Sequence, residues 1–389
     1  MKLWQKASKL NKEVEEFTAG EDVVLDMQLL EYDCDASIAH AAMLKKIKIL
    51  TRREFKSLKG ALEEIKKLDK KGKFKIKVED EDAHTAIENY LVKKLGTTGK
   101  KIHTGRSRND QVLVAIRLYT KNHLLKTMKQ TKECISLLKM LEKAHMETLM
   151  PGYTHMQRAM PSTFGLWAGA FAESFEDDIK ILEAAHKVLD QNPLGSAAGY
   201  PIMLKLDRVL TTKLLGFKKT QKNTLYCQNS RGKLEALAVG ALLQVMLDLN
   251  KMATDLLLFS THEFGFVELP QELCTGSSIM PQKKNADIFE LVRAKLGVVS
   301  SNYSRILAVI GNLPSGFNRD FQETKKPLFE SFDTTTKCLK IMSLALGKIK
   351  VNKAKMAAAV SPEMHSANNA LKLAEKGIAF RDAYMKQKV

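Results

Sequence analysis

The sequence predicts a mainly α-helical protein organised around a bundle of very long helices. Apolar residues recur at helical spacing through five long stretches, whereas only one short stretch alternates with the period of two that a strand requires. Such helices exceed the usual three or four turns, and helices that are apolar on more than one face need neighbours on several sides. We therefore expect a bundle that also packs against other subunits. The five stretches are 111–149, 162–189, 232–260, 287–310 and 328–347.

The first part of the chain predicts shorter helices ahead of the bundle. An irregular entry is expected before a helix over 36–50. Thr51-Arg52-Arg53-Glu54 fits a capping box, which starts a second helix that runs to about residue 70. Phe74–Val78 is the stretch with period two, so we expect a short edge strand there. Acidic residues from Glu79 onward suit the first turn of a third helix, because they complement its dipole.

The composition is that of an ordinary soluble protein. Apolar residues make up 44% of the chain, and no run approaches the ~20 apolar residues that span a membrane. The N-terminal segment has no apolar signal core. The five cysteines are scattered without a Cys-x-x-Cys pair, which argues against a disulfide framework and against a zinc site. We expect a cytoplasmic protein without a membrane partner and without a metal.

The formal net charge of +18 raises the question of a nucleic-acid partner. Nucleic-acid modules concentrate basic residues in a stripe, often with aromatic residues for stacking. In this sequence lysine is spread along the helices with acidic residues interleaved, so solvated helix faces explain most of the charge. We expect no nucleic-acid partner, although the charge can steer an anionic substrate inward.

Three polar loops interrupt the helical stretches. His103–Gln111 combines arginine, serine and asparagine, which suit a carboxylate because arginine pairs with it through two hydrogen bonds. Tyr153–Pro161 carries His155, a residue type that transfers protons. Glycine, serine and proline in Gly276–Asn285 disfavour a continuous helix. The backbone N–H groups of this loop, together with Lys283, can receive a carboxylate or phosphate.

The chemistry of these loops depends on their combination. Ser277 or Ser278, beside a lysine and oriented amides, could act as a base, since a nearby cation favours the alkoxide. Taken singly, His155 is more often a structural histidine, Lys283 a surface lysine and Glu290 a solvated helix residue. Each stretch is also compatible with an ordinary solvated loop. The residues alone indicate carboxylate binding and proton transfer without naming a reaction.

The motifs in these loops resemble those of the fumarase/aspartase superfamily and, within it, the argininosuccinate lyases. The loop 276–285 is similar to the superfamily signature Gly-Ser-Ser-x-Met-Pro-x-Lys-x-Asn, and 105–111 matches a hallmark of these lyases. Thr154-His155-x-Gln157 is similar to the histidine region of the superfamily. Segment 318–325 resembles the family segment that holds the substrate's carboxylates and its amino-acid end. Residues 31–44 resemble the family's N-terminal region, so the resemblance covers nearly the whole chain.

The resemblance implies a three-domain fumarase/aspartase-like fold with a central bundle of very long helices. The implied domains are an N-terminal helical domain (1–104), a central long-helix domain (105–352) and a shortened C-terminal domain (353–389). It also implies a homotetramer in which each active site draws its loops from three subunits.

The activity that the resemblance implies is the reversible β-elimination of argininosuccinate to arginine and fumarate, the last step of arginine biosynthesis, without a cofactor. Ser277 would be the base, and Lys283 would stabilise the aci-carboxylate intermediate. His155 would supply a proton to the leaving nitrogen through water, with Glu290 orienting it. The other implied binding residues are Ser107, Arg108, Asn109, Thr154, Asn285, Gln322 and Lys325, with His84 and Thr85 on the substrate side.

Three positions depart from the family pattern. Ala286 replaces a proline after the signature loop, Met160 replaces a glutamine, and Phe317 replaces a substrate-contacting tyrosine. The missing hydroxyl removes a hydrogen bond worth about 0.5–1.5 kcal/mol.

Two alternative functions remain. Adenylosuccinate lyase is disfavoured by Arg106–Gln111 and Gln322–Lys325, and a non-catalytic structural relative is disfavoured by the presence of all four implied catalytic residues.

Overall fold

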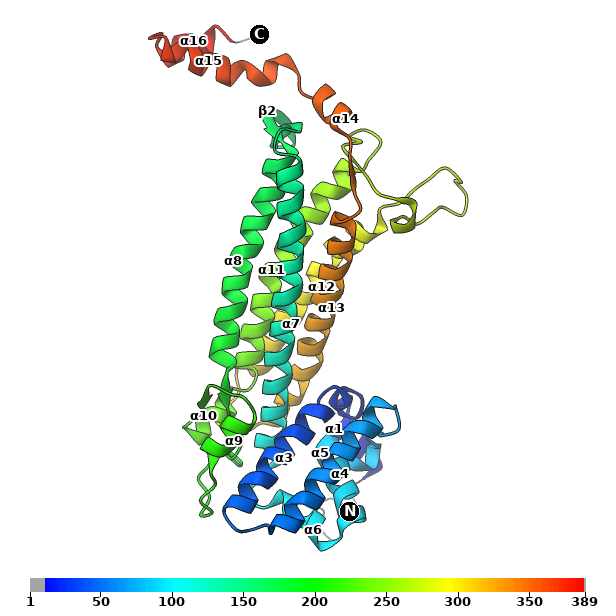
Figure 1. Cartoon of the computed structure of the whole chain (residues 1–389), viewed down its shortest axis with the longest axis vertical. Helices are drawn as coiled ribbons and strands as arrows, with labels where there is room; N and C mark the ends of the chain where they lie inside the picture. Colours follow the sequence, from blue (N-terminus) through cyan, green and yellow to red (C-terminus); the bar gives the residue numbers. More distant parts are fainter. Residues whose placement is uncertain (1–10, 388–389) are drawn as a thin grey trace. The chain divides into compact units, whose positions relative to one another are not determined.

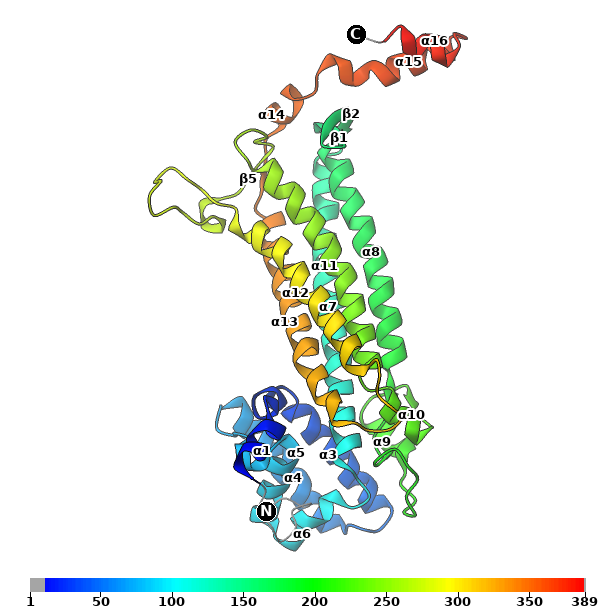
Figure 2. The same cartoon turned by 180° about the vertical axis from the view of Figure 1, so that it is seen from behind.

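The computed structural model describes residues 11–387 and is built from helices joined by loops, with three small two-stranded sheets (Figures 1 and 2). The chain forms two compact units. Unit 1 takes the described residues up to 126, then 182–240 and 301–332. Unit 2 takes 127–181, 241–300 and the described residues from 333 onward. The predicted mainly helical class is confirmed.

The five predicted long helices are present, and each contributes residues to both units. The end of each helix that belongs to a unit lies beside the corresponding ends of the others in that unit, in both views (Figures 1 and 2). Glycine and proline are absent from the longest helix, so nothing in its sequence interrupts the hydrogen-bond ladder. The helices are α7 (Arg108–Ala144), α8 (Phe164–Leu189), α11 (Lys233–Phe259), α12 (Asp287–Ile310) and α13 (Lys325–Leu346).

The N-terminal part of unit 1 is a cluster of shorter helices around one apolar core. The predicted capping box is present, because Thr51 Oγ1 accepts from the Glu54 amide at 3.2 Å and Glu54 Oε2 accepts from the Thr51 amide at 2.8 Å. Leu58, Leu62 and Ile65 of that helix are buried in the core. The helices are α1 (Lys12–Ala19), α2 (Asp22–Leu25), α3 (Leu30–Lys46), α4 (Arg52–Lys70), α5 (Ala83–Leu95) and α6 (Thr97–Lys100).

Three predictions for this region are wrong. The third expected helix, α5, begins at Ala83 and has no acidic residue in its first turn, because the acidic residues 79–82 precede it. The expected irregular entry is helical, and the helix expected over 36–50 begins at Leu30. The expected strand at Phe74–Val78 has no strand partner and is not a strand. Phe74 and Ile76 are buried in the helical core, whereas the lysines between and beside them are exposed. The alternation therefore reflects an extended segment lying on helices, not a sheet.

The remainder of unit 1 contains elements that the periodicity did not reveal. Two short strands, β3 (Gln191–Asn192) and β4 (Lys219–Thr220), pair in parallel. Short helices α9 (Arg208–Leu214) and α10 (Thr224–Asn229) precede α11, and the 3₁₀ helix η5 (Arg319–Thr324) leads into α13.

Unit 2 contains a β-hairpin where a polar loop was expected. Strands β1 (Leu149–Thr154) and β2 (Gln157–Thr163) pair antiparallel around a two-residue turn. His155 and Met156 in this turn have φ of 53° and 62°, as a tight hairpin turn requires. The cap expected at Ser162 is instead Thr163, whose Oγ1 accepts from the Leu166 amide at 3.0 Å.

The last part of unit 2 follows α13. Strand β6 (Lys350–Val351) pairs antiparallel with β5 (Val267–Glu268). Helices α14 (Lys353–Ala358), α15 (Ser366–Glu375) and α16 (Phe380–Met385) complete the described chain.

One helical stretch is strongly apolar, although no run of about 20 apolar residues was found in the sequence. Thr224–Phe259 is long and apolar enough to cross a membrane by length and composition alone. The core helix of a soluble protein passes the same test, and 56% of the apolar window is buried inside the structure.

Candidate active site

The predicted site residues form two groups, one in each unit. The residues in unit 1 are His84, Thr85, Ser107, Arg108, Asn109, Gln322 and Lys325, and those in unit 2 are Thr154, His155, Ser277, Lys283, Asn285 and Glu290.

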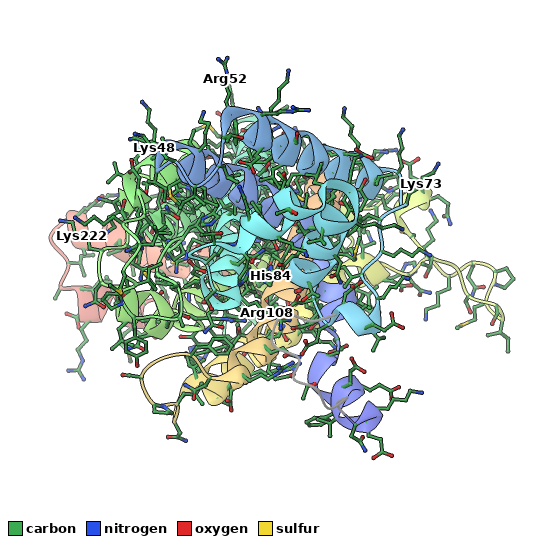
Figure 3. The ribbon with its side chains drawn as sticks, turned by 90° about the horizontal axis from the view of Figure 1, so that it is seen from below. Lys48, Arg52, Lys73, His84, Arg108 and Lys222 are labelled. Atoms are coloured by element: carbon green, nitrogen blue, oxygen red, sulfur yellow. The ribbon has the colours of Figure 1, made fainter. Side chains whose placement is uncertain are left out.

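A hollow of about 140 Å³ in unit 1 brings five of its predicted residues together. They are His84, Arg108, Asn109, Gln322 and Lys325. In Figure 3, His84 and Arg108 lie close together, whereas Lys48, Arg52, Lys73 and Lys222 extend outward. The lining also contains four carboxylates and two further arginines that the sequence motifs did not indicate as site residues, which are Asp22, Asp26, Glu81, Asp82, Arg231 and Arg319.

Arg108, the first residue of α7, is held by two carboxylates that directly precede α5. Its Nε donates to Asp82 Oδ2 at 2.9 Å, and its Nη1 and Nη2 each lie 3.4 Å from Glu81 Oε2. Asp82 also caps α5, because its Oδ1 accepts from the Thr85 amide at 2.9 Å. Burial opposes ionisation, but the charges of His84 and Arg108 outweigh it and lower the pKa of Asp82. Thr85 thus serves the cap in this structure and does not line the hollow.

His84 is buried with one ring nitrogen left open. Its Nδ1 forms a hydrogen bond with Asp33, whose other oxygen accepts from Gln111 Nε2 at 2.8 Å. Burial alone would lower the pKa of His84, but Asp33, Asp82 and Asp26 outweigh it and raise the pKa. Nε2 is buried and has no hydrogen-bond partner among residues 11–387. When His84 is protonated, its Nε2–H is a donor for an anionic ligand group.

Lys325 is buried between two carboxylates from the N-terminal segment. Its Nζ lies 2.7 Å from Asp22 Oδ1 and 2.7 Å from Asp26 Oδ1. Burial, opposed by Lys325, raises the pKa of Asp22 to about 6. Gln322 Nε2 donates to the carbonyl oxygens of Thr18 at 3.3 Å and Ala19 at 3.4 Å. The segment that resembles the family's amino-acid-binding region is thus in contact with residues 18–26.

Part of the predicted loop 103–111 serves structure rather than binding. Arg106 is buried and its Nη1 donates to Ser37 Oγ at 2.9 Å. Asp110 Oδ2 accepts from the amides of Gly195 at 2.8 Å and Ala197 at 3.1 Å. Ser107 Oγ accepts from the Asn109 amide at 3.2 Å and does not line the hollow.

In unit 2, the loop with Ser277 is closed at its base and exposed at its tip. The chain between α11 and α12 extends away from the helices that it connects (Figures 1 and 2). Asn285 Nδ2 donates to the Gly276 carbonyl at 3.2 Å across the base. Ser277 Oγ accepts from the amides of Ile279 at 3.3 Å and Met280 at 3.1 Å. Two N–H groups are thus directed at the oxygen that the sequence predicts as the base.

The remaining unit 2 residues are exposed and separate in this structure. Thr154 ends β1 and His155 occupies the hairpin turn, while Glu290 lies in the first turns of α12 and Lys283 in the loop. Within residues 11–387, no hydrogen bond or ion pair joins His155, Glu290, Lys283 and Ser277 to one another. The single chain therefore brings the binding group together but not the group predicted to be catalytic.

Residues 11–387 contain no group of three or more histidine, cysteine, aspartate or glutamate side chains placed to hold a metal ion.

The chain is similar to known lyases along nearly its whole length. The family model described as Lyase matches residues 5–301. The argininosuccinate lyase of Thermotoga neapolitana is 46% identical over 383 residues, which are 98% of this chain and 96% of that protein. The argininosuccinate lyase of Phocaeicola vulgatus is 43% identical over 385 residues, which are 99% of this chain and 86% of that protein.

Two solved structures share the fold. A crystal structure of EDDS lyase in complex with formate has a TM-score of 0.82 at 23% identity and covers 97% of this chain and 75% of that one. A fumarate lyase:delta crystallin from Brucella melitensis bound to cobalt has a TM-score of 0.79 at 18% identity and covers 97% of this chain and 90% of that one. Both likenesses confirm the predicted fumarase/aspartase-like fold.

Proposed function

This chain belongs to the argininosuccinate lyase family, and on that premise we propose how its residues carry out the reaction. The protein is a lyase, as its motifs predict. Its reaction is the reversible β-elimination of argininosuccinate to arginine and fumarate, which serves arginine biosynthesis.

The observation that carries the proposal is the environment of Ser277. An alkoxide needs nearby donors to be accessible as a base, and the amides of Ile279 and Met280 point at the Ser277 oxygen from 3.3 and 3.1 Å. Ser277 takes the proton from the carbon next to a carboxylate of the succinate part. The negative charge that develops on that carboxylate is stabilised by Lys283.

The leaving nitrogen needs a proton when the carbon–nitrogen bond breaks. His155 delivers it through water, and Glu290 orients His155. These side chains are exposed in the single chain, which supports a site completed by other subunits. Thr154 beside His155 contributes to holding a carboxylate of the succinate part.

Substrate binding is the role of the hollow in unit 1. Lys325 and Gln322 hold the amino-acid end, and His84, Arg108 and Asn109 offer donors to carboxylates. Ser107 and Thr85 act through the turn and the cap that they form beside this hollow.

Assembly into a homotetramer is supported by apolar side chains exposed on the long helices. Leu166 of α8 is 67% exposed and Leu291 of α12 is 58% exposed, although both belong to helices of the bundle. Exposed apolar surface of this kind marks protein interfaces. We place this tetramer in the cytoplasm, and the division into domains at residues 105 and 353 stays a prediction.

The direct test is to incubate the purified protein with argininosuccinate and to follow fumarate by its ultraviolet absorbance. We expect fumarate to appear at a rate proportional to enzyme concentration. A tetrameric sample that forms no fumarate would refute the enzymatic proposal. Fumarate formed from adenylosuccinate but not from argininosuccinate would refute the substrate assignment.

A further inference from the structure

Three of the four carboxylates in the unit 1 hollow are already paired within the chain. Asp26 uses one oxygen for Lys325 at 2.7 Å and the other for the Ala83 amide at 3.2 Å. Asp82 uses its two oxygens for the Thr85 amide and for Arg108. Glu81 uses one oxygen for Arg108 at 3.4 Å and the other for Arg319 at 3.2 Å. These three carboxylates therefore serve the structure.

Asp22 differs from the other three carboxylates. Its Oδ1 lies 2.7 Å from Lys325 Nζ, and its Oδ2 accepts no hydrogen bond from residues 11–387. The Asp22 side chain is 14% exposed, whereas that of Lys325 is 2% exposed. Asp22 thus lines the hollow with one carboxylate oxygen unpaired, while its other oxygen fixes the side chain in place.

A second open group in the hollow has the opposite character, as does the buried Nε of Arg231, which also lacks a partner within residues 11–387. His84 lines the hollow, is 6% exposed, and has a buried Nε2 that lacks a partner within the described chain. Its Nδ1 is held by Asp33, so the ring cannot turn to satisfy Nε2 without breaking that hydrogen bond. An imidazolium N–H in this position favours an anionic partner.

The hollow therefore offers an anionic oxygen of Asp22 and, when His84 is protonated, a cationic donor, with Lys325 in the same lining. A ligand end that matches both must carry an ammonium and a carboxylate on neighbouring atoms, as an α-amino acid does. The volume of about 140 Å³ equals that of four or five waters, since each occupies ~30 Å³ in the liquid. It is smaller than the ~300–1,000 Å³ of pockets that enclose a whole ligand, so it fits one end of a larger molecule.

We propose that Asp22 is a specificity-determining residue whose carboxylate receives the α-ammonium of the substrate's amino-acid end, while Lys325 and the Nε2–H of His84 receive the α-carboxylate. This inference rests on the proposed function. Asp22 makes the site select for amino acids over simple guanidino acids, because only an amino acid supplies the cation that Asp22 needs.

The test compares two ligands that differ only in the α-ammonium. Arginine and 5-guanidinopentanoate, which lacks that group, are measured as inhibitors of fumarate release from argininosuccinate and as ligands by calorimetry. Asp22→Asn keeps the shape of the side chain and removes its charge. A charge-assisted hydrogen bond corresponds to about a ten- to hundredfold change in affinity. We expect Asp22→Asn to lower the affinity for arginine by that factor and to change the affinity for 5-guanidinopentanoate by no more than about twofold. The KM for argininosuccinate should rise, with little change in kcat.

The matched control is Glu21→Gln. Glu21 precedes Asp22, is 60% exposed, and pairs at the surface with Lys326 at 2.7 Å. This variant should keep the wild-type preference for arginine. The proposal would be overturned if Asp22→Asn remained active but lost equal affinity for both ligands, or kept the wild-type preference for arginine over 5-guanidinopentanoate. Absence of fumarate from the wild-type protein would instead refute the proposed function itself.

Discussion

Asn285 and Thr275 exchange two backbone hydrogen bonds, at 2.9 and 3.1 Å, and so close the base of the loop that carries Ser277. The Asn285 side chain adds a bond to the Gly276 carbonyl at 3.2 Å, and Thr275 Oγ1 donates to Asp287 at the start of α12. The tip of the loop is exposed, whereas its base is tied to the helix that follows.

Asn285→Ala should therefore affect turnover more than stability. The lost hydrogen bond is exposed, so we expect a change of less than about 1 kcal/mol in the free energy of unfolding. Because the Asn285 side chain fixes the residue next to Ser277, kcat should fall by about tenfold or more. Urea unfolding and steady-state kinetics measure the two effects. Gln282→Ala, an exposed position in the same loop, is the control and should change neither.

Ser277→Ala should abolish turnover and preserve binding. Losing a proton-transferring group costs about 10²–10⁴-fold in rate. Only two exposed amides lose an acceptor, so the free energy of unfolding should stay within about 0.5 kcal/mol of the wild-type value. Ser278→Ala tests the alternative serine and should remain active. If Ser277→Ala kept wild-type kcat, Ser277 could not be the base.

Asp33→Asn should destabilise unit 1 in a pH-dependent way. Breaking a buried ion pair costs about 3–5 kcal/mol. The pKa of His84 is raised, so its contribution is fully present below the unfolded pKa of about 6.5 and is lost as pH rises through the folded value. The pKa of Asp33 is lowered by His84 and Arg106 against the effect of burial, so its contribution is lost only in acid, as pH falls through the folded value.

Urea unfolding of wild type and Asp33→Asn at pH 5.5 and pH 8.5 measures this dependence. The difference in the free energy of unfolding between the two proteins should be larger at pH 5.5 than at pH 8.5. Asp35→Asn provides the control, because Asp35 lies on the same helix but is 43% exposed and pairs with Lys66. A difference that did not change with pH would show that His84 is neutral.

Asp178→Asn should stabilise unit 2 at alkaline pH. Burial raises the pKa of Asp178 to about 8, and the nearby charge of Asp248 adds to the effect. A carboxyl whose folded pKa is raised contributes stability at low pH, and that contribution is lost as pH rises from the unfolded value of about 4 to the folded value. Removing the charge should therefore raise the melting temperature more at pH 8.5 than at pH 5. Asp177→Asn, whose side chain is 74% exposed, should show no such trend.

Gly232→Ala should destabilise unit 1 strongly. Gly232 has φ of 75°, and an added Cβ would lie 2.3 Å from Ile310 Cγ2. The left-handed conformation costs a non-glycine residue about 1–2 kcal/mol, and the clash adds about 1–3 kcal/mol. Gly72→Ala isolates the first cost, because Gly72 has φ of 65° with nothing within 4 Å of the added atom. Equal losses in the two variants, measured by urea unfolding, would contradict the steric argument.

Local signals in the sequence predicted the helices and failed for the sheets. The bounds predicted for α12 match, and the capping box at Thr51 forms as expected, because both depend on neighbours within a few positions. The hairpin turn at His155 was missed because turns with positive φ usually carry asparagine or glycine, and His155-Met156 has neither. A strand was wrongly predicted at Phe74–Val78 because alternation of apolar and polar residues shows only that one side of the segment is buried. In this structure helices, not a sheet, bury that side.

The binding group was only partly predictable for a similar reason. His84, Arg108, Gln322 and Lys325 lie in recognisable motifs, whereas Asp22 and Asp26 do not. Their connection to Lys325 spans about three hundred positions of the chain, and no local pattern records it. His155 and Glu290, which we propose to be catalytic, are exposed in the single chain, and a single sequence does not describe the contacts with other subunits that we propose for them.

The division of each unit among three separated stretches bears on how the protein is made. The core of unit 1 needs residues 301–332, which are synthesised after most of unit 2 has been added to the chain. During synthesis, neither unit therefore has all of its residues available for folding until most of the other unit has also been made. Because contacts so distant in sequence slow folding and leave apolar helices exposed meanwhile, nascent chains of this lyase should depend on chaperones more than chains whose domains are contiguous.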